Sequence, residues 1–437
     1  MESENSYGER SRSRSSLKHF VLRCQILIWI VFPSKRMGNT VNALELGIAL
    51  VALAIWVGLL GWRGQFWQAD QQLEVVAREL DWPLVCAVIP ARNEAALLPA
   101  TLRSLLQQDY PGSLSAILVE DQSTDDTANV ARKVAQALDK DSQLDVILGE
   151  PLPPGWSGKL WALEQGVRHA QKLTPPPEYL LLTDADIEHD EANLRQLVTK
   201  AKSEDLDLVS LMVRLRCESF WEQLLIPAFV FYFQKLYPFR WVNDPTNSTA
   251  AAAGGCILIR NQALNSIGGI EIIHQTLIDD CALAQAVKSN THLEHPVTGR
   301  IWLGLGSLTR SLRPYPSLAS IWDMVSRTAF TQLNYSPWLL LGTLFGMTWI
   351  YLVPPIGTVL GILTGNWLLA IAGLAGWFLM TWAYLPTIRF YKCSPLFALC
   401  LPGISLLYTL MTLDSAWRHW QGRGGAWKGR VYQVPSV

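Results

Sequence analysis

The stretch Tyr179-Leu-Leu-Leu-Thr-Asp-Ala-Asp186 is the most informative part of this 437-residue chain, because a short β-like run ends in two carboxylates. A second run, Ala116-Ile-Leu-Val119, also ends in carboxylates, Glu120 and Asp121. In open α/β sheets, ligands bind at the carboxyl ends of the strands, so we expect both clusters along one sheet edge. A third pair, Asp279-Asp280, follows later. Carboxylates placed this way suit a nucleotide, a divalent metal ion and a general base.

Short apolar runs alternate with helical patterns between about residues 83 and 300. We predict strands at 84–89, 116–119, 146–148, 179–182 and 206–211, with helices beginning near residues 95, 124, 159 and 191. This alternation predicts an α/β domain with a Rossmann-like, mostly parallel sheet and helices on both faces. No Gly-x-Gly-x-x-Gly follows the first run, which disfavours a dinucleotide fold.

Composition excludes several classes of protein. A net charge of −1 offers no basic surface for nucleic acid. The seven cysteines include no Cys-x-x-Cys pair, which argues against a zinc site or a disulfide framework and favours a reducing compartment. Neither a His-Glu-x-x-His nor a Gly-x-Ser-x-Gly motif is present, so hydrolase chemistry has little support.

Uncharged apolar stretches flank the charged middle of the chain. Residues 41–62 are long enough to span a bilayer core of roughly 30 Å, and we predict one transmembrane helix there. About three further membrane segments are expected within 337–414, at about 338–359, 367–386 and 396–413. Pro354-Pro355 and Pro402-Gly403 inside them also allow a broken or re-entrant path.

The charges at the two ends bear on orientation. Three C-terminal crossings would put the tail, residues 415–437, opposite the soluble domain, yet its basic residues favour the cytoplasm: Arg418, Arg423, Lys428 and Arg430. One segment is therefore expected to be re-entrant or interfacial, with the tail's tryptophans at headgroup level; a flexible charged tail is the alternative.

Residues 1–36 carry seven Lys or Arg against three Glu, which would drive the soluble domain outward. The segment that begins at Met37 looks like a conventional protein start. We therefore expect that residues 1–36 come from a mis-assigned translation start; a targeting segment is the alternative.

One aromatic segment inside the soluble part has two interpretations. Residues 226–239 are apolar and aromatic but too short and interrupted to cross a membrane. They form either a helix at the membrane surface, beside a lipid substrate, or a buried core helix.

Six motifs occur in a characteristic order: Val88-Ile-Pro-Ala-Arg-Asn-Glu94, Val119-Glu-Asp-Gln-Ser-Thr-Asp-Asp-Thr127, Gly158-Lys-Leu-Trp-Ala-Leu-Glu-Gln-Gly166, Thr183-Asp-Ala-Asp186, Gly254-Gly with Gly268-Gly269, and Ile278-Asp-Asp-Cys-Ala-Leu-Ala284. Together they resemble a family 2 glycosyltransferase of the GT-A fold, the nucleotide-diphospho-sugar transferase fold, with the domain expected at residues 80–336. Within that family the chain is most similar to the membrane-anchored branch that acts on lipids, and there to hopanoid-associated glycosyltransferases. Three features carry that closer similarity: the Gly155-Trp-Ser-Gly-Lys159 turn, the aromatic segment that begins at Ile226, and residues 313–336.

The resemblance implies how a nucleotide-sugar donor, expected to be a UDP-sugar, is held. Asp121 would accept the imide N–H of uracil, and Pro90 and Glu94 would complete the nucleotide pocket. Lys159 would reach the diphosphate. The alternatives without a functional role are a helix-capping carboxylate for Asp121 and a solvated surface amine for Lys159.

The resemblance also assigns metal and catalytic residues. Asp184 and Asp186 would bind the ribose and a divalent cation, Mg²⁺ or Mn²⁺, which prefer oxygen ligands and substrate phosphates. Asp280 would act as the catalytic base, with Asp279 where glutamate is more usual, and inversion at the anomeric carbon would follow. Asp279-Asp280 could also cap the helix expected to begin at Cys281.

One further motif is only partly present. In lipid-acting relatives a [Gln/Arg]-x-x-Arg-Trp motif contacts the pyrophosphate, and Met324-Val-Ser-Arg327-Thr328 keeps only its arginine. Arg327 is therefore a candidate site residue, and Arg310 and Arg313 are weaker ones. The missing residues argue against a processive synthase.

These expectations combine into one functional prediction. We expect an inverting, metal-dependent transferase that moves a sugar to a lipid hydroxyl, with a hopanoid as the first acceptor. The protein would be a multi-pass protein of the cell (inner) membrane with its catalytic domain on the cytoplasmic face. Diacylglycerol, a ceramide-like lipid or a polyprenyl phosphate are alternative acceptors. A degenerate membrane interaction or export component is the alternative outside enzymes.

Overall fold

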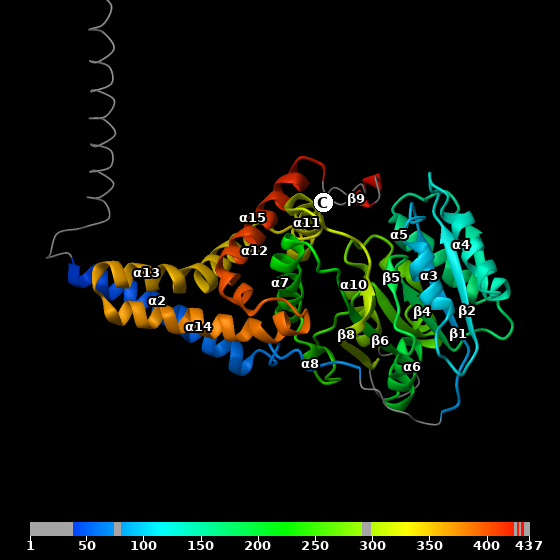
Figure 1. Cartoon of the computed structure of the whole chain (residues 1–437), viewed down its shortest axis with the longest axis horizontal. Coiled ribbons are helices and arrows are strands. Elements are labelled where there is room, and N and C mark those ends of the chain that lie inside the picture. The colour runs from blue at the N-terminus through cyan, green and yellow to red at the C-terminus, as the bar shows by residue number, and fades with distance from the viewer. Residues whose placement is uncertain (1–37, 74–79, 291–298, 424–425, 428–429, 432–437) are drawn as a thin grey trace, which may run out of the picture. The chain divides into compact units, whose positions relative to one another are not determined.

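The computed structural model describes residues 38–73, 80–290, 299–423, 426–427 and 430–431 (Figure 1). The predicted extension at 1–36 and part of the predicted tail lie outside these residues. The chain divides into two compact units. One contains residues 38–54 and 353–376, and the other contains residues 55–352 together with the chain from 377 onward.

The second unit is built on a sheet whose described strands follow the order β3-β2-β1-β4-β7-β6-β8-β5. Their bounds are β1 (Val85–Ala91), β2 (Leu114–Glu120), β3 (Leu144–Leu148), β4 (Tyr179–Thr183), β5 (Ile187–Glu188), β6 (Leu208–Arg214), β7 (Cys256–Arg260) and β8 (Ile301–Ser311). A separate antiparallel pair joins β9 (Ala426–Trp427) and β10 (Arg430–Val431). All five strands predicted from the apolar runs are present, which confirms the α/β class.

The sheet is mixed rather than simply parallel. Strands β3, β2, β1 and β4 run parallel, as the alternation predicted. Strand β7 runs antiparallel to both β4 and β6, while β8 is parallel to β6. Neither β7 nor β8 was predicted. An apolar run carries no information about strand direction, so the reversal at β7 could not be seen in the pattern.

Helices pack on both faces of the sheet, which Figure 1 shows. The side chains of β1 alternate between the two faces: Val85, Ala87 and Ile89 join one buried cluster, and Cys86 and Val88 join the other. The first cluster is covered by α3 (Leu98–Leu106), α4 (Thr127–Ala137) and α6 (Asn193–Ser203), and the second by α5 (Gly158–Ala170) and α10 (Asp279–Lys288). The period-two pattern of the strand thus builds both halves of the core.

Short elements connect these layers, and α11 follows the last long strand. They are η1 (Asp141–Gln143), α8 (Phe239–Val242), α9 (Asn261–Ser266), η2 (Ile270–Ile273), α11 (Leu318–Ser326) and η3 (Thr331–Leu333).

The aromatic segment forms α7 (Phe220–Leu236), and its apolar face is buried. Ile226 and Val230 pack into the cluster beneath the sheet, whereas Leu225, Ala228 and Phe231 pack against helices later in the chain. Of the two interpretations of this segment, the buried core helix is the one that the structure supports. The aromatic side chains are needed on two sides because α7 fills the space between two cores.

Seven elements make up the apolar ends of the chain: α2 (Gly38–Trp62), α12 (Pro337–Met347), η4 (Thr348–Leu352), α13 (Val353–Thr364), α14 (Trp367–Phe390), η5 (Pro395–Cys400) and α15 (Leu401–Trp420). Among the described residues, four stretches are long and apolar enough to cross a membrane: Ala43–Trp62, Pro337–Thr364, Trp367–Phe390 and Pro395–Trp420. The last helix, α15, extends beyond the membrane segment expected at 396–413 and ends at Trp420. Arg418 and His419 in its last turn interact favourably with the helix dipole, so they do not break it.

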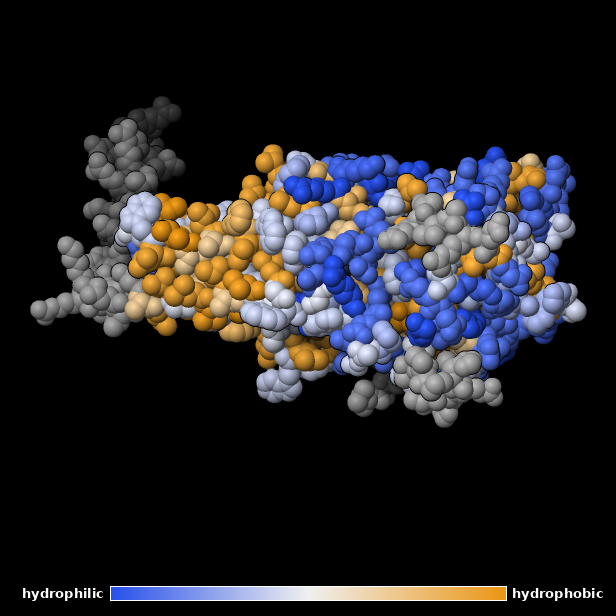
Figure 2. All heavy atoms as spheres, turned by 90° about the horizontal axis from the view of Figure 1, so that it is seen from below, coloured by the Kyte–Doolittle hydropathy of each residue, from blue (hydrophilic) through white to orange (hydrophobic). Residues whose placement is uncertain are grey.

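The first unit is a close-packed group of apolar helices. A Cβ atom on Gly373 would lie 2.5 Å from the carbonyl oxygen of Pro354, so only glycine permits this approach of α14 to α13. Ala49, Leu369 and Ala372 are buried at the contact. The outward side chains are apolar, for example Leu363 and Leu368, and Figure 2 shows a continuous hydrophobic surface over α2, α13 and α14. A surface of this kind suits contact with lipid.

Gly166 offers a test of how α5 packs on the sheet. A Cβ atom at this position would lie 2.4 Å from Cγ1 of Val88 and 3.0 Å from Cγ2 of Val119. We expect Gly166→Ala to destabilise the protein by about 1–3 kcal/mol, because overpacking displaces the strand side chains. Gly403→Ala is the control, since no atom lies within 4 Å of its Cβ position. Thermal unfolding of the purified protein in detergent measures both; equal Tm values for the two variants would contradict this packing.

Candidate active site

Two of the three carboxylate clusters meet at one sheet edge, as predicted. Strands β2 and β4 flank β1 and run parallel to it, so their carboxyl ends point the same way. Asp121 follows β2, and its N–H donates to the carbonyl oxygen of Ala91 at the end of β1 (2.8 Å). Asp184 follows β4. The third cluster, Asp279 and Asp280, forms the first turn of α10.

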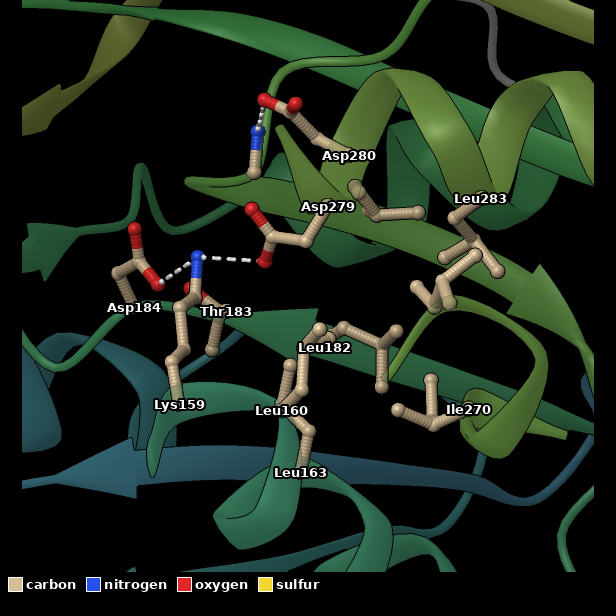
Figure 3. Close-up of a pocket in the computed structure, with 13 residues that line it drawn as sticks. Lys159, Leu160, Leu163, Leu182, Thr183, Asp184, Ile270, Asp279, Asp280 and Leu283 are labelled. Carbon is tan, nitrogen blue, oxygen red and sulfur yellow. Dashed lines mark hydrogen bonds and ion pairs between the residues drawn. The ribbon is translucent and has the colours of Figure 1, made fainter. Parts of the chain in front are cut away.

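Lys159 joins the second cluster to the third (Figure 3). Its Nζ atom lies 3.0 Å from Oδ1 of Asp184 and 3.3 Å from Oδ2 of Asp279. The side chain reaches this position from the first turn of α5, where Ser157 caps the helix by accepting the N–H of Leu160. Burial lowers the pKa of Lys159, but the charges of Asp184 and Asp279 outweigh it, so the pKa stays above its ordinary value. Lys159 is therefore a half-buried ammonium group paired with two carboxylates, and not the solvated surface amine of the alternative.

Asp280 is held by two backbone N–H groups. Its Oδ2 accepts from Gly254 (2.9 Å) and its Oδ1 accepts from Cys281 (2.8 Å). Burial, and then the charge of Asp279, raise the pKa of Asp280 to about 6, although Lys159 partly offsets them. The helix begins at Asp279 and not at Cys281, and the residue before it, Ile278, makes no side-chain cap. Both carboxylates thus lie in the positive first turn of α10, where the dipole favours them.

Apolar side chains form the floor beneath these charges. The pocket around Lys159 is lined below by leucine and isoleucine side chains: Leu160, Leu163, Leu182, Ile270, Ile273 and Leu283. Its polar rim consists of Lys159, Asp184, Asp279 and Asp280. Charges next to an apolar surface interact more strongly with a ligand than charges in water do.

Asp186 faces a different cation. Ser311 Oγ donates to Oδ2 of Asp186 (2.5 Å), and Nε of Arg313 lies 3.4 Å from the same oxygen. Nη2 of Arg313 also donates to Oε1 of Glu94 (2.6 Å), so Arg313 connects Glu94 to Asp186. The sequence ranked Arg313 among the weaker candidates and did not indicate Ser311. The signal for Arg313 was its position before Pro314-Tyr315; Ser311 is an ordinary polar residue at a strand end and carried no signal.

Asp121, the residue predicted to bind the base of the nucleotide, has a charged neighbour in the first motif. Its side chain is almost fully buried, and its Oδ2 lies 3.7 Å from Nη1 of Arg92. The same Arg92 nitrogen donates to the carbonyl oxygen of Asp121 (2.5 Å). The following helix, α4, begins at Thr127 and has Asp126 at its N-cap position, so the capping alternative for Asp121 is wrong. Arg92 lies in the first motif but was not predicted as a site residue; Pro90, in β1 of the same motif, lies next to Ala91.

Arg327 and Arg310 are not among the residues that line the pocket around Lys159. Arg327 ends α11 with an exposed side chain, for which the described structure shows no hydrogen bond. Arg310 is paired with Glu188 at the surface (2.5 Å). A motif identifies a residue type at a position along the chain, but the direction of its side chain depends on where the helix ends.

The residues present fit a divalent cation that shares its coordination with a ligand. Among the described residues, no three His, Cys, Asp or Glu side chains converge to form a complete metal site. Asp184 and Asp186 supply hard carboxylate oxygens on either side of one residue, in the turn between β4 and β5. Mg²⁺ and Mn²⁺ are commonly held by one or two carboxylates plus substrate phosphates, and such a donor set suits them.

The contact of Lys159 with Asp184 can be measured by a double-mutant cycle. We expect Lys159→Met to lower the free energy of unfolding by about 1–3 kcal/mol, because it leaves two carboxylates without their cation. This value lies between those typical of exposed and of buried ion pairs. Adding Asp184→Asn should recover part of that loss, since the neutral amide no longer needs a charged partner. Thermal unfolding of the two single variants and the double variant gives the coupling. Strictly additive effects would show that the two side chains do not interact.

Comparison with known proteins agrees with this geometry. Residues 86–268 match the sequence model of Glycosyl transferase family 2. The 4,4'-diaponeurosporenoate glycosyltransferase of Staphylococcus aureus (strain USA300) is 34% identical over 99 residues, which cover 23% of this chain and 24% of the relative. The same enzyme from the bovine strain RF122 / ET3-1 is 31% identical over 121 residues, 28% of each chain. The match thus spans about a quarter of the length of these curated relatives.

A solved structure shares the fold. It is the mannosyltransferase of Pyrobaculum calidifontis in complex with GDP-Man and Mn²⁺, with a TM-score of 0.51 and 19% identity, covering 86% of this chain and 99% of that one. The sheet order, the helices on both faces and this likeness agree with the predicted GT-A fold. Residues 86–268 of this chain therefore resemble Glycosyl transferase family 2, and the chain shares the GT-A fold with that solved structure.

Proposed function

We propose that the protein is an inverting glycosyltransferase that moves a sugar from a nucleotide-diphospho-sugar, expected to be a UDP-sugar, to the hydroxyl of a membrane lipid. One observation carries the proposal: Lys159 connects Asp184, at the end of β4, with Asp279, beside Asp280. A cation in this position lies between the predicted donor site and the predicted base. Support comes from the mannosyltransferase of similar fold, whose structure contains GDP-Man and Mn²⁺.

The residues divide the chemistry among them. Asp121 would accept the N–H of the base, with Pro90, Glu94 and Arg92 around it. Lys159 would neutralise the diphosphate. Asp184 and Asp186 would hold a divalent cation, which when bound stabilises the charge of the departing diphosphate. Arg327 lies outside the pocket; we retain it as a candidate for contact with the acceptor or the diphosphate in the loaded enzyme.

The transfer step assigns a proton to Asp280. The carboxylate takes the proton of the acceptor hydroxyl as that oxygen forms a bond with the anomeric carbon. The bond from the anomeric carbon to the diphosphate oxygen breaks, and the diphosphate leaves with the electron pair. Attack from the face opposite the leaving group inverts the configuration. Asp279 keeps Lys159 in place and contributes to the raised pKa of Asp280. The pKa of the proposed base, about 6, therefore lies close to neutral pH.

The acceptor is proposed to be a lipid for two reasons. Four described stretches of the chain are apolar and long enough to cross a membrane. The curated relative is named a 4,4'-diaponeurosporenoate glycosyltransferase. A hopanoid remains our first acceptor, and a diacylglycerol, a ceramide-like lipid or a polyprenyl phosphate are alternatives. We place the catalytic domain on the cytoplasmic face of the cell membrane.

An acceptor and donor panel with a base variant tests this function. Detergent-purified protein is incubated with Mn²⁺, labelled nucleotide sugars and total lipid extract, and labelled lipids are identified by mass spectrometry. We expect Asp280→Asn to lower transfer by on the order of 10²–10⁴-fold, because the amide cannot accept the proton, while donor binding measured by calorimetry persists. Asp141→Asn, an exposed carboxylate in η1, is the control and should be fully active. If the wild-type protein bound neither donor nor Mn²⁺, the degenerate, non-enzymatic alternative would be favoured.

The pH dependence of transfer should report on Asp280. The base must be ionised, and its pKa is raised to about 6, so we expect kcat/KM to rise as pH increases through about 6 and then to level off. In Asp279→Asn the neighbouring negative charge is gone and Lys159 remains, so the acidic limb should move to lower pH. An acidic limb at the same or a higher pH in this variant would rule out the proposed coupling.

A further inference from the structure

The last apolar stretch, Pro395–Trp420, packs along the part of the second unit that carries the sheet. This part, residues 80–336, is called the catalytic unit below. Tyr408 in α15 donates its hydroxyl to the carbonyl oxygen of Leu225 in α7 (2.9 Å), and the hydroxyls of Ser405 and Tyr232 lie 2.6 Å apart. Further along, Ser326 at the end of α11 donates to the carbonyl oxygen of Met411 (3.2 Å). The contact of α15 with α7 and α11 therefore extends along most of the helix.

Both partners of α15 are parts of the catalytic unit. α7 lies between β6 and β7, two adjacent strands of one sheet, so both of its ends are tied to that sheet. α11 follows β8 of the same sheet, and Gln332 beyond it donates to the hydroxyl of Tyr237, just after α7 (2.7 Å). A helix whose two ends return to one sheet does not carry the chain across a bilayer.

The chain before α15 is already at the catalytic unit. Arg214, the last residue of β6, donates to the carbonyl oxygen of Tyr391 just after α14 (2.9 Å). The sulfur atoms of Cys217 and Cys393 lie 3.5 Å apart. The segment that leads into α15 thus begins beside strand β6.

The chain at the end of α15 is also at the catalytic unit. Arg418 is paired with Asp323 in α11 (2.7 Å), and Trp322 donates to Asp414 (2.7 Å). The N–H of Phe330 donates to the hydroxyl of Ser415 (3.0 Å). The chain just before this apolar stretch and the last turns of the stretch itself therefore contact segments that precede Pro337.

The outward face of α15 is an apolar stripe, defined by Leu406, Leu410, Leu413, Trp417 and Trp420. These side chains follow the spacing of one helix face and are 44%, 41%, 38%, 59% and 57% exposed. The opposite face, with Ile404, Tyr408 and Met411, is buried against the protein. Two tryptophans beside Arg418 and Arg423 suit the headgroup level of a membrane, where amphipathic rings and basic side chains are favoured.

We propose that α15 is an interfacial helix, seated on the membrane surface by this apolar stripe, and not a fourth crossing. The stretches Pro337–Thr364 and Trp367–Phe390 then leave the catalytic side and return to it. The chain after α15 lies on the same side as the catalytic unit, together with its basic residues. This resolves the conflict between three C-terminal crossings and a basic tail. The bilayer surface is the partner, and the inference does not depend on the sugar or lipid transferred.

Cysteine accessibility in the full-length chain tests the proposal. In a background with Cys24 and Cys400 replaced by serine, single cysteines are introduced as Lys133→Cys in α4, Thr364→Cys at the end of α13, and Gln421→Cys after α15. Each is labelled with a membrane-impermeant maleimide in intact and in permeabilised cells, and the parent background corrects for the remaining cysteines. We expect Gln421→Cys to react as Lys133→Cys does and Thr364→Cys to react oppositely. Labelling of Gln421→Cys together with Thr364→Cys overturns the proposal, as does labelling of Thr364→Cys together with Lys133→Cys.

A depth measurement provides an independent readout that does not rely on sidedness. Spin labels are placed in turn at Leu406, Leu413 and Trp420, and their accessibility to oxygen and to a polar relaxation agent gives their depth in the bilayer. An interfacial helix gives nearly equal depths, whereas a crossing helix changes depth by about 21 Å over these positions, at 1.5 Å per residue. Labels at Leu368, Leu374 and Phe378 of α14 are the control and should show the steep change. A gradient in α15 as steep as that in α14 would refute the interfacial placement.

Discussion

The cation of Lys159 is the interaction on which the site depends. Asp184, Asp279 and Asp280 come from two distant parts of the chain, and three carboxylates close together repel one another. Lys159, contacting Asp184 at 3.0 Å and Asp279 at 3.3 Å, places a positive charge between them above an apolar floor. Its position in turn depends on α5, whose N-cap Ser157 and close packing at Gly166 hold the helix against β1 and β2. Core packing on one face of the sheet thus decides the electrostatics at its edge.

A second network holds the other half of the site. Arg313 lies between Glu94, from the loop after β1, and Asp186, from the turn before β5. This contact joins the start of the domain to the chain just after its last long strand, β8. The two aspartates of the turn therefore contact different cationic side chains: Asp184 contacts Lys159 and Asp186 contacts Arg313. Such a division keeps each carboxylate satisfied before a ligand arrives, because a buried charge without a partner is costly.

The proposed placement of α15 connects the site to the membrane. α7 contributes to the core beneath the sheet and to the core shared with α15, so one helix belongs to both. Asp280 begins α10, and Tyr237 at the end of α7 lies close enough to Cys281 to affect the pKa of its thiol, which burial raises. An acceptor held in the bilayer surface beside α15 and α11 would therefore approach the base from the side of α7.

The sequence by itself determined the fold class, the order of the strands that bear carboxylates, the apolar ends and most of the residues proposed for the site. These follow from local patterns: periodicity, strand-end carboxylates and the order of six motifs. Only the tertiary structure decided that β7 is reversed, that α7 is buried, that Asp121 does not cap α4, that Arg313 lies at Asp186 and that Arg327 is exposed outside the pocket. Each of these depends on which segments meet in space, and a side chain's partners come from residues far away in the chain. Lys159 shows the difference: its position in a motif suggested a role, but the two carboxylates that pair with its ammonium group lie 25 and 120 residues away.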